Sequence, residues 1–298
     1  MQGARQDDIW LKEPVKIDSH QHFWRYDARE YPWIDAAKSA LRRDFLPPDL
    51  AREQAPMGYD GAIVVQARQT TEETRWLLEL AEKDPRIRGV VGWVDLQSAA
   101  VRESLGRFAA HPKFVGVRHV VQDEPDDRFL MRPGFLRGIE ALAEFGLVYD
   151  LLIFPKQLPA AIELARHFPS QPFVLDHIAK PFIKDRLITP WQEQIFELAA
   201  CPNVHCKVSG MVTEADWKGW QSADFAPYLD VVLEAFGPAR LMVGSDWPVC
   251  LLAADYRMAI GLAEDYFARL SPAEQEKILG SNALAFYRRR VPWAGKFA

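Results

Sequence analysis

The stretch His20-Gln21-His22-Phe23-Trp24 follows the first apolar run of the chain, residues 15–20, and contains no glycine. This turn decides between two α/β architectures. An open, doubly wound sheet that binds a nucleotide carries a glycine-rich turn after its first strand. A closed barrel instead uses the loops after its strands for functional side chains. The turn therefore favours a barrel.

Outward from this turn, eight short apolar runs alternate with longer segments of helical periodicity. Most of the runs are nearly continuous, as in Ala62-Ile63-Val64-Val65, which is typical of parallel strands covered on both faces. Eight β-then-α units predict a (β/α)8 TIM barrel of the α/β class, for which 298 residues suffice. The predicted strands cover residues 15–20, 61–66, 88–95, 114–120, 147–153, 172–177, 203–208 and 241–246.

Helix signals separate the predicted strands. Thr70 and Glu73 have the spacing of a capping box, Gly146 suits the position just after a helix, and Pro272 suits a first helical position. We expect one domain over residues 1–298, with residues 1–14 as an N-terminal extension, because no linker or repeat divides the chain. The predicted helices include residues 98–110, 135–145, 158–168, 190–200, 228–236, 253–270 and 282–287.

The composition excludes several classes of protein. The net charge is −5 and no run of Lys or Arg forms a basic stripe, so we expect no nucleic-acid partner. No stretch approaches the roughly 20 apolar residues of a membrane span. The three cysteines, Cys201, Cys206 and Cys250, predict buried thiols in a reducing compartment, hence a cytoplasmic protein. The sequence leaves homo-oligomerisation open.

Ionisable side chains mark the ends of three predicted strands. His20 and His22 lie two residues apart, so they face the same side of the first strand. His177 ends the sixth strand and Asp246 ends the eighth. Imidazole and carboxylate groups are the usual ligands of a divalent metal, and a carboxylate beside imidazoles stays ionised and accepts a proton from water. The four residues therefore predict one catalytic site at the mouth of the barrel.

This arrangement resembles the amidohydrolase superfamily, which has HxH after the first strand, His after the sixth and Asp after the eighth. Several longer motifs resemble its branch of sugar lactonases, whose members include L-fuconolactonase and L-rhamnonolactonase. These motifs are Ile17-Asp18-Ser19-His20-Gln21-His22-Phe23-Trp24, Tyr31-Pro32-Trp33, Phe45-Leu46-Pro47-Pro48-Asp49-Leu50, Gly116-Val117-Arg118-His119, Glu124-Pro125-Asp126, Gly244-Ser245-Asp246-Trp247-Pro248 and Gly280-Ser281-Asn282-Ala283.

The resemblance implies hydrolysis of a small-molecule sugar lactone, an aldonolactone such as L-fuconolactone. Asp246 is the expected general base, with His20, His22 and His177 as further catalytic residues. The implied metal is one divalent ion, most naturally zinc, on His20, His22 and Asp246. The chain lacks the family's frequent His after strand five and its bridging residue after strand four, which argues against a binuclear centre. The related pyrone-dicarboxylate hydrolases work without metal, so the resemblance leaves open whether the metal is required or dispensable.

Substrate contacts are expected from residues near the same strand ends, namely Gln66, Arg118, His119, Trp33 and Trp24. Arg118 and His119 cannot both point inward from a regular strand, because successive side chains alternate between its faces. Asp150 and Lys207 are expected to form a structural ion pair inside the barrel, since buried charges normally pair.

Three other functions stay open at this stage. A metal-dependent decarboxylase of the aminocarboxymuconate semialdehyde type shares the HxH, His and Asp pattern. A pyrone-dicarboxylate lactonase needs several arginines for two carboxylates, and Arg118 is the one obvious candidate. A sugar-binding barrel without catalysis is the third, and the retention of four ionisable groups argues against it.

Overall fold

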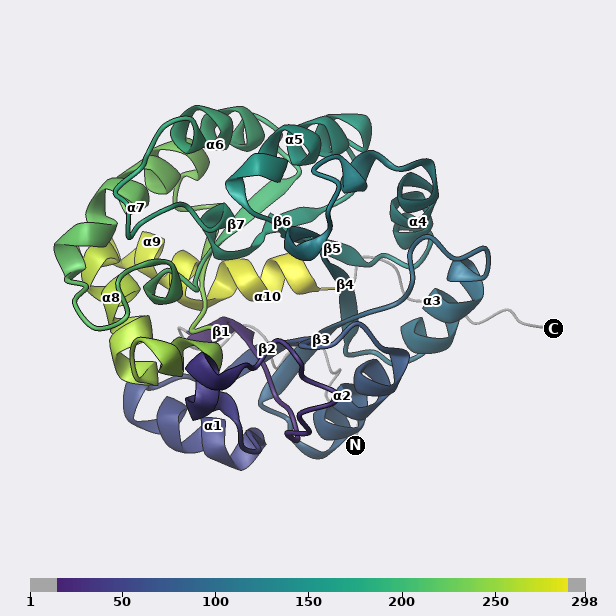
Figure 1. The fold of residues 1–298 in the computed structure, drawn as a ribbon, viewed down its shortest axis with the longest axis horizontal. Helices are drawn as coiled ribbons and strands as arrows, with labels where there is room; N and C mark the ends of the chain where they lie inside the picture. The colour runs from purple at the N-terminus through teal and green to yellow at the C-terminus, as the bar shows by residue number, and fades with distance from the viewer. Residues whose placement is uncertain (1–14, 289–298) are drawn as a thin grey trace, which may run out of the picture.

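The structure, a computed structural model, describes residues 15–288. Eight strands form one sheet in which each strand pairs in parallel with the next along the chain (Figure 1). The sheet closes where Gln21 bridges Trp247 and where the Asp246 amide donates to the His20 carbonyl at 2.8 Å. The predicted (β/α)8 barrel is confirmed. The strands are β1 (Ile17–Gln21), β2 (Gly61–Val65), β3 (Ile87–Gly92), β4 (Phe114–Val120), β5 (Val148–Leu152), β6 (Phe173–Leu175), β7 (Val204–Val208) and β8 (Leu241–Val243).

Helices surround the barrel and connect its strands (Figure 1). The short helix after β1 was not among the predicted helices; its start is held by Asp49, which accepts from the Leu46 amide at 2.9 Å. The helix after β7 begins at Ser222, upstream of the predicted residue 228, because Asp224 accepts from the Gln221 amide at 2.9 Å and Pro227 is accommodated inside the helix. The helices are α1 (Pro47–Gln54), α2 (Thr71–Lys83), α3 (Val101–Ala109), α4 (Pro133–Glu144), α5 (Leu158–His167), α6 (Trp191–Ala199), α7 (Ser222–Phe236), α8 (Tyr256–Phe267), α9 (Pro272–Glu276) and α10 (Asn282–Tyr287).

The capping signal at Thr70 is confirmed in part. The Thr70 hydroxyl accepts from the Glu73 amide at 3.2 Å and so caps α2. Glu73 does not bond back to Thr70. Its carboxylate instead accepts from the amides of Ala67 and Arg68, at 2.9 and 2.7 Å, and from the Tyr31 hydroxyl at 3.2 Å. Glu73 therefore fixes the loop that leaves β2.

The C-terminal helix α10 closes the end of the barrel where the strands begin. It contributes three buried side chains to an apolar cluster inside the strands. The Tyr287 hydroxyl also donates to Asp150 at 2.8 Å, which ties α10 to the next layer of the interior. The apolar cluster comprises Ile17, Ile63, Val65, Val91, Val115, Val148, Val174, Met242, Ala283, Phe286 and Tyr287.

A layer of buried charges lies inside the barrel beyond this cluster. Lys207 Nζ is 2.6 Å from Asp150 and 3.0 Å from Asp176, and Arg118 Nη1 is 3.1 Å from Asp176. The predicted Asp150–Lys207 pair is therefore confirmed, within a larger network of two cations and two carboxylates. Burial raises the pKa of Asp150 to about 6. For Asp176 burial acts in the same direction, but Lys207, His20 and Arg118 hold its pKa well below the usual range. The two positive and two negative charges balance, which reduces the energetic cost of burying them.

The remaining expectations concern the cysteines, membrane spans, cellular location, oligomeric state and N-terminal residues. The cysteines are free and buried, as predicted. None of the helices in residues 15–288 is both long and apolar enough to cross a membrane. The cytoplasmic location and the oligomeric state stay predictions, and the proposed N-terminal extension, residues 1–14, lies outside the described part of the chain.

Candidate active site

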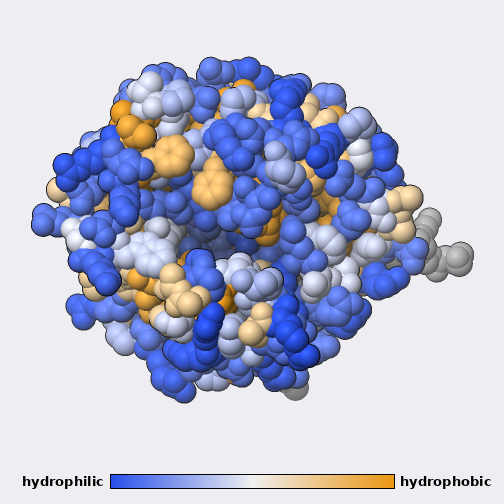
Figure 2. Space-filling view, viewed as in Figure 1, coloured by the Kyte–Doolittle hydropathy of each residue, from blue (hydrophilic) through white to orange (hydrophobic). Residues whose placement is uncertain are grey.

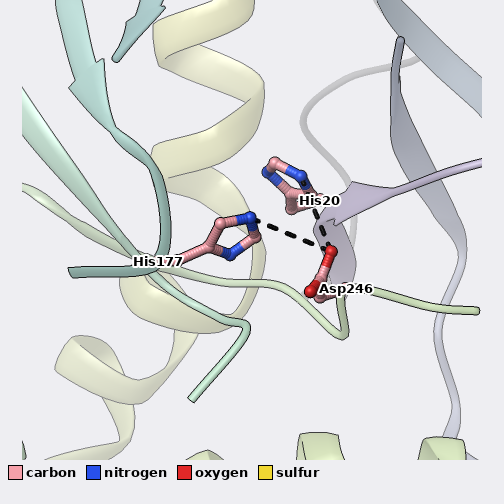
Figure 3. Close-up of side chains that lie close together, drawn as sticks. All are labelled: His20, His177 and Asp246. Atoms are coloured by element: carbon pink, nitrogen blue, oxygen red, sulfur yellow. Dashed lines mark ion pairs between the residues drawn. The ribbon is translucent and has the colours of Figure 1, made fainter. Parts of the chain in front are cut away.

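The four ionisable residues predicted from the strand ends lie together. Figure 3 shows three of them, His20, His177 and Asp246. His22 Nε2 is 3.2 Å from Asp246 Oδ1, and the Nε2 atoms of His20 and His177 are each 3.9 Å from the same oxygen. All four residues are at most 4% exposed. In the space-filling view a hollow lined largely by hydrophilic residues lies near the centre of the molecule, over the barrel (Figure 2).

Two of these residues lie beyond their strands rather than on them. The strands were expected to reach residues 177 and 246, but β6 ends at Leu175 and β8 at Val243. His177 and Asp246 have φ values of +54° and +56°, in the left-handed region. Each such residue costs about 1 kcal/mol or more, so the surrounding contacts must hold it.

Hydrogen bonds from distant segments hold this backbone. Asp18 accepts from the amide and the hydroxyl of Ser245, at 2.9 and 2.6 Å, and so fixes the residue before Asp246. Trp191 donates to the Ile178 carbonyl at 2.8 Å. At Gly210, with φ +60°, a Cβ atom would lie 2.4 Å from Nδ1 of His177. A residue without a side chain is therefore required for the ring of His177 to pack there.

The hydrogen bond of His22 to the backbone determines which of its nitrogens faces Asp246. Nδ1 lies 2.8 Å from the Val65 carbonyl, which only accepts, so Nδ1 carries a proton. In a neutral ring the lone pair of Nε2 then points at the Asp246 carboxylate, 3.2 Å away. Two acceptors at this distance repel unless a proton or a cation lies between them. The geometry is therefore that of a site for a positive charge.

His20 is enclosed by charged groups. Arg118 Nη1 is 3.2 Å from its Nε2, and Lys207 Nζ is 3.1 Å from its Nδ1. Asp176 Oδ1 lies 3.3 Å from Nδ1. Burial, with Lys207 and His177, lowers the pKa of His20 well below its usual value despite Asp176. Burial likewise lowers the pKa of His177 to about 4. Both rings are therefore neutral at physiological pH.

Three of the side chains could hold a metal ion. Ligand atoms of His20, His177 and Asp246 all lie within 4.8 Å of one another, and all three residues are buried. Two imidazole nitrogens and a carboxylate oxygen are suitable donors for a zinc-like ion. The sequence-based set was His20, His22 and Asp246; the geometric set contains His177 and does not contain His22. For Asp246 burial acts to raise the pKa, but the imidazoles of His177, His22 and His20 hold it below the usual range. The carboxylate is therefore ionised and ready to ligate or to accept a proton.

Strand alternation separates Arg118 from His119. Arg118 points into the barrel, where it contacts His20 and donates to the Gln66 carbonyl. Gln66 is fully buried and donates to the Arg118 carbonyl at 3.2 Å. His119 points the other way: it stacks on Phe129 and lies 2.7 Å from Glu124. The structure thus places Gln66 and Arg118 beside the cluster and His119 on the outer face of β4.

The two tryptophans predicted to contact substrate lie in an aromatic cluster. Trp24 has no exposed surface, and its indole donates to the carbonyls of Leu41 and Arg43 at 3.3 and 3.0 Å. Trp33 is half-buried and packs edge-on against Trp24, with ring centroids 5.8 Å apart. Trp24 is therefore part of the core of the loop after β1, and of the two only Trp33 keeps exposed surface.

Sequence reasoning missed several residues that complete the site. Asp176 precedes His177 and faces inward like Val174, a signal that alternation offers. Ser209, whose hydroxyl lies 2.9 Å from Nδ1 of His177, follows β7 directly. No sequence signal indicates it, because the contact depends on how two loops meet.

Comparison with known proteins assigns the chain to a family. The family model described as Amidohydrolase matches residues 17–289. The chain belongs to the amidohydrolase family. A relative from Burkholderia multivorans named L-fucono-1,5-lactonase is 43% identical over 289 residues, 93% of this chain and 97% of the relative. A second protein of that name, from Burkholderia ambifaria, is 39% identical over 277 residues, 92% of this chain and 95% of the relative.

A solved amidohydrolase from Burkholderia multivorans is also similar. That crystal structure, with bound zinc, is 44% identical, has a TM-score of 0.87 and matches 92% of this chain and 99% of its own. Membership of the amidohydrolase family and the clustering of His20, His177 and Asp246 both point to a divalent metal.

Proposed function

We propose that this amidohydrolase is a lactonase that hydrolyses a sugar lactone, an aldonolactone such as L-fuconolactone, to the sugar acid. The observation that carries the proposal is Asp246, an ionised carboxylate enclosed by three histidines in a chain 43% identical to an L-fucono-1,5-lactonase. A lactone needs an attacking water and stabilisation of the negative charge that develops on its carbonyl oxygen.

Asp246 is the proposed general base. It takes a proton from water as the water oxygen attacks the lactone carbonyl carbon. When the tetrahedral intermediate collapses, the bond to the ring oxygen breaks and Asp246 returns the proton to that oxygen. Base catalysis of this kind contributes roughly 10²- to 10⁴-fold in rate. The low pKa of Asp246 keeps it in the required ionised form throughout the neutral range.

The histidines and Arg118 are the proposed partners of the carbonyl oxygen. His20 and His177 are neutral, so each ring has one nitrogen that donates and one that accepts. Arg118 supplies a fixed positive charge next to His20, at 3.2 Å. Gln66 holds the Arg118 backbone through its side-chain amide. Together they place positive charge and hydrogen-bond donors where negative charge develops.

We propose zinc as the divalent metal, bound by His20, His177 and Asp246 with His22 adjacent; on His20 the ion would take the place of the Arg118 contact. Such an ion supplies Lewis-acid polarisation of a carbonyl and acidifies bound water. The zinc in the similar Burkholderia multivorans structure supports this assignment. The contact of His22 Nε2 with Asp246 fits it, because a proton or a cation must lie between the two groups. Metal content by mass spectrometry before and after chelation, paired with lactone turnover, tests the ion and its role separately.

A pH-indicator assay on aldonolactones tests the function. We expect proton release from L-fuconolactone, galactonolactone or rhamnonolactone, and Asp246→Asn should lower kcat/KM by roughly 10²- to 10⁴-fold. Asp185→Asn, which alters an exposed carboxylate after β6, is the matched control and should retain full activity. Near-normal hydrolysis by Asp246→Asn refutes the assignment of the base. Carbon dioxide release from a carboxylic acid, with no lactone turned over, would instead establish a decarboxylase.

A further inference from the structure

Two charged residues that the proposed mechanism does not use lie beside the histidine cluster. Lys180 ends the left-handed turn that begins at His177, and its amide donates to the His177 carbonyl at 2.7 Å. Glu214 ends the 3-10 turn Val212–Glu214 that follows β7. Both residues therefore lie on loops that leave the carboxyl ends of the strands, the face on which barrel enzymes bind their substrates.

Lys180 and Glu214 face each other across a short gap. Lys180 Nζ is 3.8 Å from Glu214 Oε1, and the two side chains are 17% and 22% exposed. The Lys180 ammonium also lies 5.6 Å from the centroid of the Phe154 ring, on the loop after β5. A separation of 3.8 Å is longer than a hydrogen bond, so both charged groups keep capacity for a third partner.

The backbone holds the pair in place next to the reacting groups. The Lys184 amide donates to the Glu214 carbonyl at 3.0 Å, which joins the loop after β6 to the loop after β7. The charge of Lys180 acts on the ring of His177, and the charge of Asp246 acts on the carboxyl of Glu214. The pair is therefore within electrostatic reach of the cluster.

The chemistry of the pair suits a polyol. Lys180 donates and Glu214 accepts, so together they satisfy both sides of a hydroxyl group, and their charges cancel. Because the two charges cancel, the pair offers an anionic substituent no net attraction, whereas a hydroxyl group can accept from Lys180 and donate to Glu214. The adjacent Phe154 ring offers an apolar face to sugar C–H groups.

We propose that Lys180 and Glu214, with Phe154 beside them, form the subsite that recognises hydroxyl groups of the lactone and so determine its substrate specificity. This inference rests on the proposed lactonase function. In the bound complex a ring hydroxyl bridges Lys180 Nζ and the Glu214 carboxylate. The subsite acts on binding rather than on the bond that breaks.

Comparison of a hydroxylated lactone with an unsubstituted one tests the subsite. For Lys180→Met and Glu214→Gln we expect kcat/KM on L-fuconolactone to fall roughly 10- to 100-fold, mainly through KM, because each variant loses a hydrogen bond to a charged group. On δ-valerolactone, which has no hydroxyl group, the same variants should stay within about twofold of the wild type. Lys184→Met, which alters an exposed lysine four residues further on, should leave kcat/KM unchanged on both lactones.

The possible results separate the two levels of the proposal. Equal losses on both lactones, or no loss on either, would overturn the subsite while leaving the lactonase intact. Failure of the wild type on every aldonolactone would overturn the lactonase and the subsite with it. If Lys180→Met does not fold, Glu214→Gln, which keeps the shape of the side chain, decides the question alone. Circular dichroism and Tm confirm that each variant compared is folded.

Discussion

The buried lysine of the charge layer gives the sharpest test of how the barrel interior is stabilised. Lys207→Met removes the cation that Asp150 and Asp176 share, at 2.6 and 3.0 Å. All three side chains have no exposed surface, so neither water nor salt replaces the lost charge. Arg118 remains as partner of Asp176, at 3.1 Å, and among residues 15–288 Asp150 keeps only the Tyr287 hydroxyl.

The expected loss is large because one carboxylate is left without a counter-charge. Removal of one partner from a buried ion pair costs about 3–5 kcal/mol. For a domain of this size each kcal/mol corresponds to about 2–4 °C, so Tm should fall by roughly 6–20 °C at pH 7 to 8. The matched control is Lys156→Met, which breaks the exposed pair of Lys156 with Asp127, at 2.7 Å. That variant should lose less than about 1 kcal/mol.

The pH dependence identifies the carboxylate as the cause. Burial already raises the pKa of Asp150 to about 6, and loss of Lys207 raises it further. A carboxyl whose pKa is higher in the folded state than in the unfolded state destabilises the protein as pH rises above the unfolded value. The defect of Lys207→Met should therefore be larger at pH 8 than at pH 5. Differential scanning calorimetry at the two pH values measures it.

Two results would refute this account. The first is a loss of stability in Lys207→Met no larger than that in Lys156→Met. The second is a defect that does not change between pH 5 and pH 8. A further arm is the double variant Lys207→Met/Asp150→Asn, which removes the unpaired charge and should recover part of the lost stability.

Three other predictions concern backbone strain, the aromatic cluster and acid stability. Arg186 has φ +55°, so Arg186→Gly should be more stable than Arg186→Ala by about 1 kcal/mol in urea denaturation, since both lose the contact with Asp224 and only glycine relieves the strain. Trp24→Phe should lower stability by about 2 kcal/mol, because it removes an indole N–H that two carbonyls share and part of a buried ring. Trp33→Phe removes a buried indole N–H without a partner among residues 15–288 and should cost less than about 1 kcal/mol. Equal losses would contradict the described cluster. The pKa of His177 is about 4 against an ordinary 6.5, so the unfolded chain takes up a proton there between these values and metal-free protein should lose stability as pH falls through this window. His177→Gln should show a flatter decline, and an unchanged slope would contradict the buried neutral ring.

The sequence predicts the barrel well because its strands are buried on both faces. Runs such as Ala62-Ile63-Val64-Val65 are short and rich in β-branched residues, which favours a strand over a buried helix, and eight strands close into one sheet. The positions at which β6 and β8 end are harder to predict from the sequence. The bonds that turn the chain at Ser245 come from Asp18, which is 227 residues away, and no local pattern encodes a contact of that range.

The candidate site shows the same division between local and distant information. Strand alternation separates Arg118 from His119 and directs Lys207 inward, so both facts follow from the sequence. The choice of His177 as a third ligand does not, because it depends on Gly210 leaving room for the ring. The role of Trp24 is also ambiguous from the sequence, because a tryptophan that contacts substrate and a tryptophan in the core can have the same neighbours along the chain.

Nε2 of His20 connects the metal question with the charge layer. It belongs to the His20, His177 and Asp246 cluster, yet Arg118 Nη1 lies 3.2 Å from it. One lone pair serves one partner, so an ion on this nitrogen and the Arg118 contact exclude each other. When the ion is removed, the Arg118 guanidinium therefore takes its place as the positive charge beside His20. Nothing comparable replaces the Asp246 carboxylate, and for this reason we expect lactone hydrolysis to survive chelation better than it survives Asp246→Asn.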